Sequence, residues 1–551
     1  MFILLSSLWL AWEIKYVLFW IFLWQLKDYH IGRFADHFRT HKGKKLIFNP
    51  VQVFKIILLV LFLTSVGIFV YLFSILFLIY LGEFILFLRG IVKKSVKKPV
   101  ITFKTVFLTT VFFGAAVLFL LWAFKQDDLS QPALFLEFDI LTPVIISAIV
   151  LFFQPFFVAI RSNTLRKAKN KLEKIKLVSG LKVIAITGSY GKTSTKEFLS
   201  TILSKKYKVL KTKEHQNSEI GVAKCILEDL SAQGGPASGG KPYQFFIAEV
   251  GAYNKGKVKE VCSILKPKIG IVSGVNEQHL ALFGSLKNLL SAEGGGELAD
   301  ALGGDGILFI NGDNKYCRDL YKSFSGNISH GIQAKIYSLS NKIIDSDIWA
   351  DGIEIHKNSI SFMAIDKMGE LMHFDVRVLG KQNVQNLLGA ILVAKELGMT
   401  FGQIADACKD IYQKQAGMVL RQNKHGIFVI DSSYSSNPDG VFADLDYFSV
   451  FQGKRAIVMP CLIELGNKSS EIHERIGKKI AQTCNLAIIT SKDKFKKIKK
   501  GAMSAGMNER NILLCDKPQD IYSAITVFCK SGDAVLLEGR VSAKLLSLLA
   551  D

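Results

Sequence analysis

Residues 183–195 read Val183-Ile184-Ala185-Ile186-Thr187-Gly188-Ser189-Tyr190-Gly191-Lys192-Thr193-Ser194-Thr195. A short apolar run ends in a turn bracketed by two glycines, and a helical pattern follows from Lys196 to Leu203. Glycines let backbone N–H groups crowd around an anion, and the N-terminus of the following helix adds partial positive charge there. This order of strand, glycine loop and helix predicts a phosphate site at Thr187, Gly188, Ser189, Tyr190, Gly191, Lys192, Thr193 and Ser194.

Two residues of the loop suit particular tasks. We expect Lys192 to reach the terminal phosphates of a nucleotide and the Thr193 hydroxyl to ligate Mg²⁺. The standard P-loop has a glycine at the position that Ile186 occupies in this chain. The alternative is a glycine-rich turn with a chance lysine, and it is disfavoured because the strand and helix patterns are both in place.

The length and charge of the chain limit the classes of protein it can be. With 551 residues, several domains are expected. Lys and Arg number 69 against 47 Asp and Glu. Because much of this surplus flanks long apolar runs, we expect contact with membrane lipid and not with nucleic acid. All eight cysteines follow residue 220 without a Cys-x-x-Cys pair, which predicts neither a zinc site nor a disulfide framework.

The first 160 residues are apolar in long stretches. The runs lie at about 4–25, 55–88, 102–124 and 141–160, and runs of this length are typical of bilayer spans. The first run carries charged residues, lacks a small-residue cleavage site and precedes further runs. It therefore fits a span better than a signal peptide.

The charges between these runs predict an orientation. Basic residues concentrate in 26–54, in 89–104 and after 160, so these segments should face the cytoplasm. The segment 125–140 should face outward, because it is acidic and holds Asp127, Asp128, Glu137 and Asp139. The part of the chain after residue 160 is then cytoplasmic.

This orientation makes the run 55–88 cross the membrane twice. We expect a tight turn near Tyr71–Ser74, which gives five segments with the N-terminus outside. The alternative is one long tilted helix and four spans. Few ionisable residues occur in the runs, with Glu83 the main one, which disfavours a transport pathway.

From about residue 180, strand patterns alternate with helical patterns, which is typical of a parallel sheet covered by helices. The expected strands are 182–187, 244–249, 269–273, 306–310, 427–431, 455–459, 486–490 and 534–538. A new strand–helix series starts near 420. We therefore expect a membrane region (1–160), a basic linker (161–179) and two α/β domains (180–420 and 421–551). Ser231–Gly240 reads as a flexible surface insertion.

Polar groups stand just past two of these strands, where α/β proteins place ligands. One strand ends in Glu249, and another leads to His279. A carboxylate and an imidazole at neighbouring strand ends could hold a divalent metal. His279 alone would be an ordinary loop residue, but its place beside the phosphate loop favours a metal ligand.

At this point the chain resembles the Mur ligase family, most closely its MurF type. The loop Thr187–Ser194 looks like the ATP motif of that family. Further motifs follow in family order: Asn217-x-x-x-Gly221, Glu249-x-Gly251-Ala252, Asn276-x-x-His279-Leu280, Gly380-x-x-Asn383-x-x-Asn386, Arg421, Asp431-x-x-Tyr434-x-x-Asn437-Pro438 and Glu464-Leu465-Gly466 with His473. The resemblance covers about 180–551.

The resemblance implies an ATP-dependent carboxylate–amine ligase with a P-loop-containing central domain and a Rossmann-like C-terminal domain. It would add D-alanyl-D-alanine to a UDP-MurNAc-peptide in peptidoglycan precursor synthesis, through an acyl phosphate. Implied roles are charge neutralisation by Lys192, Mg²⁺ binding by Thr193, Glu249 and His279, adenine contact by Asn383 and Asn386, phosphate and ribose contact by Arg421 and Asp431, and substrate contact by Asn217, Tyr434, Asn437 and Pro438.

Three departures from the family qualify this assignment. A lysine, often carbamylated, usually supplies a carboxylate to the second metal, and Glu293 stands near that position as a candidate catalytic residue. The segments Asp431–Pro438 and Leu537-Glu538-Gly539-Arg540 differ from the usual runs on the side that meets the amine. Membrane segments replace the small UDP-binding domain.

Several alternatives stay open. Asn386 could cap a helix, Arg421 could be a surface charge, and the Tyr434–Pro438 segment could be only a turn. The enzyme could serve another pathway of the poly-glutamate or cyanophycin type, or a lipid-linked acceptor. A transporter or signalling protein driven by a nucleotide domain, and a silent scaffold, are the non-ligase alternatives.

Overall fold

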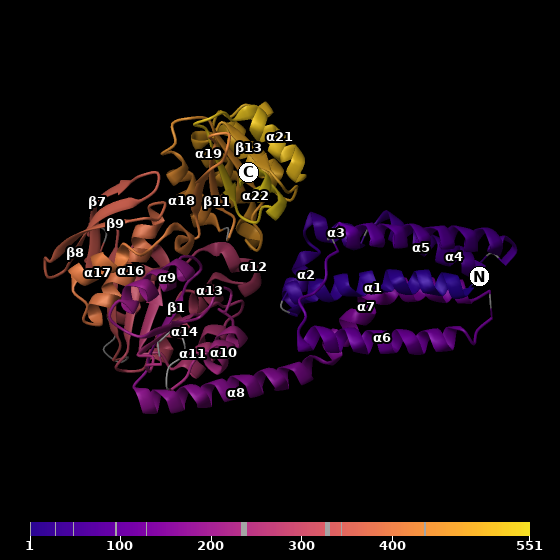
Figure 1. Cartoon of the computed structure of the whole chain (residues 1–551), viewed down its shortest axis with the longest axis horizontal. Helices are drawn as coiled ribbons and strands as arrows, with labels where there is room; N and C mark the ends of the chain where they lie inside the picture. The colour runs from indigo at the N-terminus through magenta and orange to yellow at the C-terminus, as the bar shows by residue number, and fades with distance from the viewer. Residues whose placement is uncertain are drawn as a thin grey trace. The chain divides into compact units, whose positions relative to one another are not determined.

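The computed structural model describes residues 2–27, 29–47, 49–64, 66–93, 96–127, 129–232, 240–325, 331–342, 344–434 and 437–550. Most of the expected insertion Ser231–Gly240 lies outside these residues, as does Asp128. The chain forms two compact units, Met1–Ser162 and Asn163–Asp551. Figure 1 shows the first as long helices and the second as sheets flanked by helices.

The first unit is helical. Its elements are α1 (Phe2–Leu26), α2 (Ile31–His37), α3 (His41–Ile47), α4 (Pro50–Thr64), the 3₁₀ turn η1 (Val66–Ile68), α5 (Phe69–Val92), α6 (Phe103–Ala123), α7 (Gln131–Phe152) and the start of α8 (Gln154–Ser179). Trp9, Trp24, Tyr80 and Phe112 are among the largest side chains buried in its core.

Among the described residues, five helices are long and apolar enough to cross a membrane, by length and composition alone. The double crossing of the run 55–88 agrees with two separate helices, α4 and α5. However, the expected turn at Tyr71–Ser74 is wrong, because these residues lie inside α5. The chain breaks earlier, at η1, where Gly67 lowers the helix propensity of the run.

The expected acidic loop 125–140 is also wrong for most of its length. Glu137 and Asp139 lie within α7, which begins at Gln131 with Pro132 in its first turn. Proline favours that position because its missing N–H would have no partner in a first turn. Asp139 is fully buried, so its charge faces the helix bundle and not the solvent.

The segment 161–179 was expected as a linker and is the C-terminal part of α8. It contains no glycine or proline, and Leu165, Ala168, Leu172 and Ile175 recur at helical spacing. These four side chains are buried in a core of the second unit. The same sequence therefore supplies a basic outer face and an apolar inner stripe.

Within the described residues, nine strands form the first sheet of the second unit. They are β1 (Lys182–Thr187), β2 (Val209–Lys211), β3 (Phe245–Glu249), β4 (Ile269–Val272), β5 (Ile307–Asn311), β6 (Gln333–Ser338), β7 (Ile348–Ile355), β8 (Ile360–Asp366) and β9 (Leu371–Val376), in the order β2-β3-β1-β4-β5-β6-β7-β8-β9. The sheet is parallel up to β7, and β7, β8 and β9 are antiparallel.

Strand β1 lies between β3 and β4, and its two faces meet two cores. Val183 and Ala185 pack toward α10 (Glu219–Glu228), α11 (Lys257–Leu265) and α14 (Gly296–Leu302). Ile184 and Ile186 pack toward α9 (Lys192–Ser204), α16 (Gln382–Glu396) and α17 (Phe401–Cys408). A strand covered on both faces explains the unbroken apolar run that precedes the glycine loop.

The remaining helices of this part are α12 (Leu280–Phe283), α13 (Leu286–Ala292) and α15 (Lys315–Ser325).

Six strands form the second sheet within the part of the chain that the structure describes. They are β10 (Val419–Gln422), β11 (Phe428–Ser432), β12 (Arg455–Met459), β13 (Leu486–Ile489), β14 (Ile512–Leu514) and β15 (Ala534–Glu538), in the order β10-β11-β15-β12-β13-β14. Its helices are α18 (Pro438–Phe448), α19 (Ser469–Thr483), α20 (Phe495–Ser504), α21 (Pro518–Phe528) and α22 (Ala543–Ala550). The mixed α/β class expected from the sequence is confirmed.

Candidate nucleotide and metal site

The loop between β1 and α9 requires both of its glycines. Gly188 and Gly191 have φ angles of 139° and 77°, in the left-handed region. A Cβ atom on Gly188 would lie 2.4 Å from Ser273 Oγ, and one on Gly191 would lie 2.5 Å from Asn386 Oδ1. The backbone therefore turns tightly against β4 and α16 and directs the N-terminus of α9 at the loop.

Two polar atoms of this loop are suited to a phosphate. Lys192 Nζ folds back over the loop and donates to the carbonyl oxygen of Gly188. Thr187 Oγ1 is buried without a hydrogen-bond partner. Because an unpaired buried hydroxyl costs free energy, an anion that accepts its hydrogen bond fits here. Ser194 points elsewhere, since its hydroxyl donates to the carbonyl of Ala416 at 3.4 Å.

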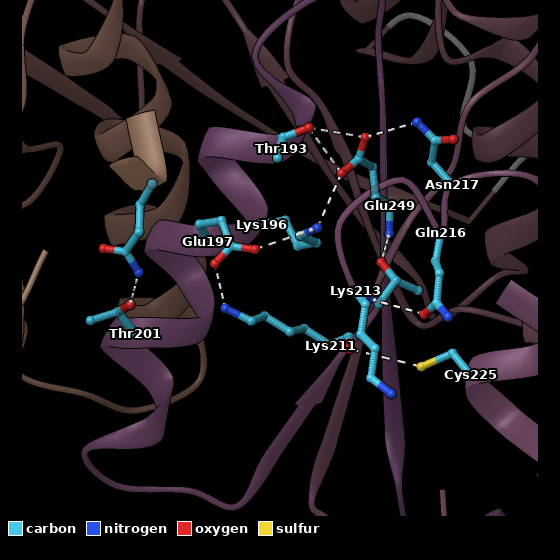
Figure 2. Close-up of polar contacts among 12 residues, drawn as sticks. Thr193, Lys196, Glu197, Thr201, Lys211, Lys213, Gln216, Asn217, Cys225 and Glu249 are labelled. Atoms are coloured by element: carbon cyan, nitrogen blue, oxygen red, sulfur yellow. Dashed lines mark hydrogen bonds and ion pairs between the residues drawn. The ribbon is translucent and has the colours of Figure 1, made fainter. Parts of the chain in front are cut away.

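Glu249 ends β3 at the centre of a polar cluster (Figure 2). Thr193 Oγ1 lies 3.1 and 3.0 Å from its two carboxylate oxygens. Asn217 Nδ2 donates to one oxygen at 3.1 Å, and Lys196 Nζ to the other at 3.2 Å. Glu249 is only 5% exposed. A hydroxyl and a carboxylate this close fit the first coordination shell of Mg²⁺.

Lys196 is the residue of this cluster that the sequence reading missed. Its side chain is fully buried, and its ammonium group also lies 3.5 Å from Glu197 Oε1. The signal was present in the spacing, because Lys196 falls on the same face of α9 as Leu199 and Leu203. A charge on the buried face of a helix requires an opposite charge nearby.

A second cluster joins the glycine loop to Glu293. The Ser189 hydroxyl donates to Glu293 Oε2 at 2.7 Å, and His279 Nδ1 donates to Glu293 Oε1 at 2.8 Å. Glu293 is 1% exposed. In a neutral ring, donation from Nδ1 leaves the lone pair of Nε2 available to a metal. The arrangement fits a carboxylate that orients a metal-binding histidine.

Glu293 is held in its charged form. Burial alone would raise the pKa of its carboxyl, but His279, Lys192 and the Ser189 hydrogen bond outweigh burial and lower that pKa below its usual value. The carboxylate therefore supplies a full negative charge beside the loop.

The two α/β parts of the second unit touch near His279. Asn276 Nδ2 donates to Asn437 Oδ1 at 2.9 Å and to Asp439 Oδ2 at 3.0 Å. Glu464 has a left-handed φ of 68°, and its carbonyl accepts a hydrogen bond from the Ala281 N–H at 3.1 Å. Its Oε2 lies 3.8 Å from His279 Nε2. A cavity of about 560 Å³ opens beside this contact, between Leu280–Leu286 and Gly466–Lys468.

Asn437 has the role of a helix cap. Its side chain accepts a hydrogen bond from the Gly440 N–H at 3.0 Å, and Pro438 follows in the first turn of α18. His473 is likewise structural, since its Nε2 accepts from the Leu462 N–H at 2.9 Å. Burial lowers the pKa of His473. This histidine fixes the loop that leads to Glu464.

Tyr434 lies near the Glu249 cluster. Its ring stacks on His215, with ring centres 5.5 Å apart. Burial, followed by the charge of Glu249, raises the pKa of the Tyr434 hydroxyl to about 12. Ser435 and Ser436, which complete the quoted motif, lie outside the described residues.

Other predicted contact residues are satisfied by the protein itself. Asn383 donates to the Leu379 carbonyl at 2.7 Å and accepts from Asn386 at 3.1 Å, and both are buried in α16. Tyr190 accepts from Asn314 at 3.2 Å. Asp431 accepts from the Ser433 hydroxyl at 2.6 Å.

Arg421 is exposed on β10 and lines a second cavity of about 560 Å³ with Arg377, Tyr412 and Lys414. The side chains around this cavity are mostly polar, and none of its lining residues belongs to Thr187–Ser194. The structure therefore brings the glycine loop, Glu249, Glu293 and His279 together, and it gives Arg421 a separate cavity.

Within the described residues, no group of three or more His, Cys, Asp and Glu side chains forms a ready metal cage. Glu249 pairs with Thr193, and His279 pairs with Glu293, so the carboxylate and the imidazole stand in two clusters. This pattern fits metal ions whose other ligands are phosphate oxygens and water.

Comparison with known proteins gives two family matches. The Mur ligase middle domain matches residues 186–394, and the family model described as "Mur ligase, glutamate ligase domain" matches residues 418–541. The first match covers most of the part of the chain that forms the first sheet, and the second match covers the part that forms the second sheet.

Curated relatives have modest identity. UDP-N-acetylmuramoyl-tripeptide--D-alanyl-D-alanine ligase of Escherichia coli (strain K12) is 27% identical over 299 residues, which are 54% of this chain and 61% of the relative. The Borreliella burgdorferi protein of that name is 31% identical over 54% of this chain and 59% of the relative. The chain spans 59 to 63% of the length of the first four such relatives.

Solved structures have the same fold. MurF of Acinetobacter baumannii matches with a TM-score of 0.61 at 21% identity, over 71% of this chain and 80% of that one. MurF of Thermotoga maritima in complex with ADP matches with a TM-score of 0.58 at 20% identity, over 71% and 83%.

Proposed function

The chain belongs to the Mur ligase family by its middle and C-terminal domains, and we propose that it is an ATP-dependent ligase that joins a carboxylate to an amine through an acyl phosphate. The observation that carries this proposal is the pair of carboxylate clusters at one glycine loop. Glu249 meets the loop end through Thr193, and Glu293 meets it through Ser189.

The reaction has two steps. An oxygen of the acceptor carboxylate attacks the γ-phosphorus of ATP, and the bond to the bridging oxygen breaks so that ADP leaves with the electron pair. The amine then attacks the acyl carbon, gives up a proton and expels inorganic phosphate. Both steps develop negative charge that the site must neutralise.

Each residue of the clusters has a task in this scheme. The N–H groups of Gly188–Lys192 and the ammonium of Lys192 hold the phosphates. Thr193 and Glu249 would hold one Mg²⁺ and His279 a second, and the ions would supply positive charge at the phosphate and acyl oxygens. Glu293 orients the His279 ring and keeps it in one tautomer.

The remaining sequence-based assignments belong to the proposal. The ATP-binding domain is 180–420 and the C-terminal domain 421–551. Asn383, Asn386, Arg421 and Asp431 serve the nucleotide. The substrate contacts are Asn217, Tyr434, Asn437 and Pro438, with Asn437 and Pro438 near the amine. Since Asn276 reaches Asn437 and Asp439, movement of the C-terminal domain would reshape the site.

For substrates, we propose a UDP-muramoyl-tripeptide-like acceptor and D-alanyl-D-alanine, as in the names of the curated relatives. The apolar helices of the first unit support a multi-pass protein of the bacterial inner membrane with its ligase part in the cytoplasm. This location favours a lipid-linked acceptor as the alternative substrate.

The test is ADP release by the purified full chain. The acceptor and the dipeptide are supplied together and singly, and a lipid-linked acceptor is supplied in a separate series. Dependence on acceptor and amine together supports the proposal. ADP release that neither substrate changes, or equal release by Lys192→Met, would reject it.

A further inference from the structure

Four ionisable side chains meet inside the helix bundle of Met1–Ser162. Glu13, Lys55 and Asp139 are fully buried, and Glu83 is 8% exposed. They come from α1, α4, α7 and α5, and each lies near the middle of a stretch long and apolar enough to span a bilayer, which for Lys55 is Gly43–Thr64. An anchor needs no charge at that depth, and charges there are costly.

Asp139 is the best-satisfied carboxylate of the four. Lys55 Nζ lies 2.5 Å from its Oδ2, and the Tyr80 hydroxyl donates to the same oxygen at 3.1 Å. Trp12 Nε1 donates to Oδ1 at 3.0 Å. Three donors on one carboxylate stabilise its ionised form. Lys55 also donates to Glu83 Oε2 at 2.8 Å.

Glu13 has a different environment. The Thr142 hydroxyl lies 3.0 Å from Glu13 Oε2 and 2.9 Å from the carbonyl oxygen of Phe138. A hydroxyl has one hydrogen, so it donates to only one of these two acceptors. Within a helix, threonine commonly donates to the carbonyl four residues earlier, which here is Phe138. The short contact with Glu13 is then satisfied only if Glu13 carries a proton and donates it to Thr142.

The number of charged groups in the cluster agrees with a protonated Glu13. The carboxyl groups that face the cluster are Glu13, Glu83 and Asp139, and the cations are Lys55 and the half-buried Lys15, whose ammonium lies 4.8 Å from the Trp12 ring. Tyr16 and Tyr80 are the other titratable neighbours. Two cations balance two carboxylates, so the third carboxyl lacks a counter-charge. Glu13 Oε1 is buried without a partner, which marks Glu13 as that group.

We propose that the membrane unit contains a proton-binding site in which Glu13 on α1 holds the proton and Thr142 on α7 accepts its hydrogen bond. Removal of the proton leaves an uncompensated carboxylate against the apolar core and breaks the contact between α1 and α7. The packing of these helices is therefore linked to proton binding. This inference rests on the apolar helices lying in lipid and is independent of the proposed ligase reaction.

The test is infrared spectroscopy of the full chain in lipid nanodiscs, read at the C=O stretch of a protonated carboxylic acid. We expect such a band at neutral pH and its loss in Glu13→Gln. Glu137→Gln is the control, because Glu137 is an exposed glutamate on α7, the helix that carries Thr142, and it should keep the band. A band lost in Glu83→Gln but kept in Glu13→Gln would overturn the assignment, as would the lack of any band.

Three further measurements keep the proposal testable if Glu13→Gln fails to fold. In the unmodified chain, titration to alkaline pH should remove the band, and Thr142→Val should shift its frequency because the acceptor is gone. A band that disappears when NaCl is added at constant pH would mean that a metal cation and not a proton occupies the site, and it would also overturn the proposal.

Discussion

Glu293 Oε1 lies 2.8 Å from Nδ1 of His279, and Oε2 of Glu293 accepts a hydrogen bond from the hydroxyl of Ser189 in the glycine loop. One carboxylate thus connects the expected phosphate loop with the expected metal ligand. Because Glu293 is buried, loss of its charge would leave the His279 ring without its partner.

We expect Glu293→Gln to lower kcat for ADP release by about 10- to 100-fold, the range typical of residues that orient a metal ligand. The amide keeps the shape of the side chain but loses its charge. Steady-state kinetics with varied Mg²⁺ measure the effect, which should include a weaker metal dependence. Asp300→Asn, an exposed carboxylate on α14, is the control, and equal effects of the two variants would contradict the assignment.

The lowered pKa of Glu293 predicts how acid acts on the fold. A carboxyl whose folded-state pKa lies below its unfolded value of 4.5 stabilises the protein fully above pH 4.5, and this stabilisation is lost as the pH falls through the folded-state pKa. Unfolding of the unmodified chain and of Glu293→Gln should therefore differ most near neutral pH. The difference should shrink below pH 4.5. A constant difference between pH 7 and pH 3 would argue against a charged Glu293.

The sequence was sufficient to predict the glycine loop and the strand and helix that flank it. Apolar residues on both faces identify a buried strand, and the glycines fix the turn. The eight expected strands are all present, and the described strands that were not among them are β2, β6, β7, β8, β9, β10 and β14. In β7 and β9 exposed residues interrupt the buried ones, because only one face of each strand meets a core.

Long-range partners were beyond the sequence. Lys196 and Glu249 are 53 residues apart, and Lys55 and Asp139 are 84 apart, so no spacing rule joins them. The reading of Asp139 as a loop residue failed for this reason. Lys55, in the apolar run 55–88, pairs with Asp139, which stands outside the apolar runs in the sequence.

Removal of Lys196 should lower the free energy of unfolding, because it leaves the buried charge of Glu249 without its cation. We expect Lys196→Met to destabilise the protein by about 3 kcal/mol, because Glu249 stays buried without its cation. The double variant Lys196→Met with Glu249→Gln should recover part of this loss. Unfolding in denaturant, followed by far-ultraviolet circular dichroism, measures the free energy of unfolding of the single and double variants. Additive effects in the two single variants would show that the pair does not interact.

The glycine at position 191 gives the sharpest test of the loop. In Gly191→Ala the new Cβ would lie 2.5 Å from Asn386 Oδ1, and the φ of 77° adds about 1–2 kcal/mol of backbone strain. Gly180→Ala is the matched control, since Gly180 has a φ of 68° but no atom within 4 Å of the added Cβ. Both variants carry the strain, and only Gly191→Ala carries the clash beside the loop. We expect Gly191→Ala to lose nucleotide binding, measured by calorimetric titration with ADP and Mg²⁺, and Gly180→Ala to keep it. If Gly191→Ala binds nucleotide as tightly as Gly180→Ala does, the loop is not the phosphate site.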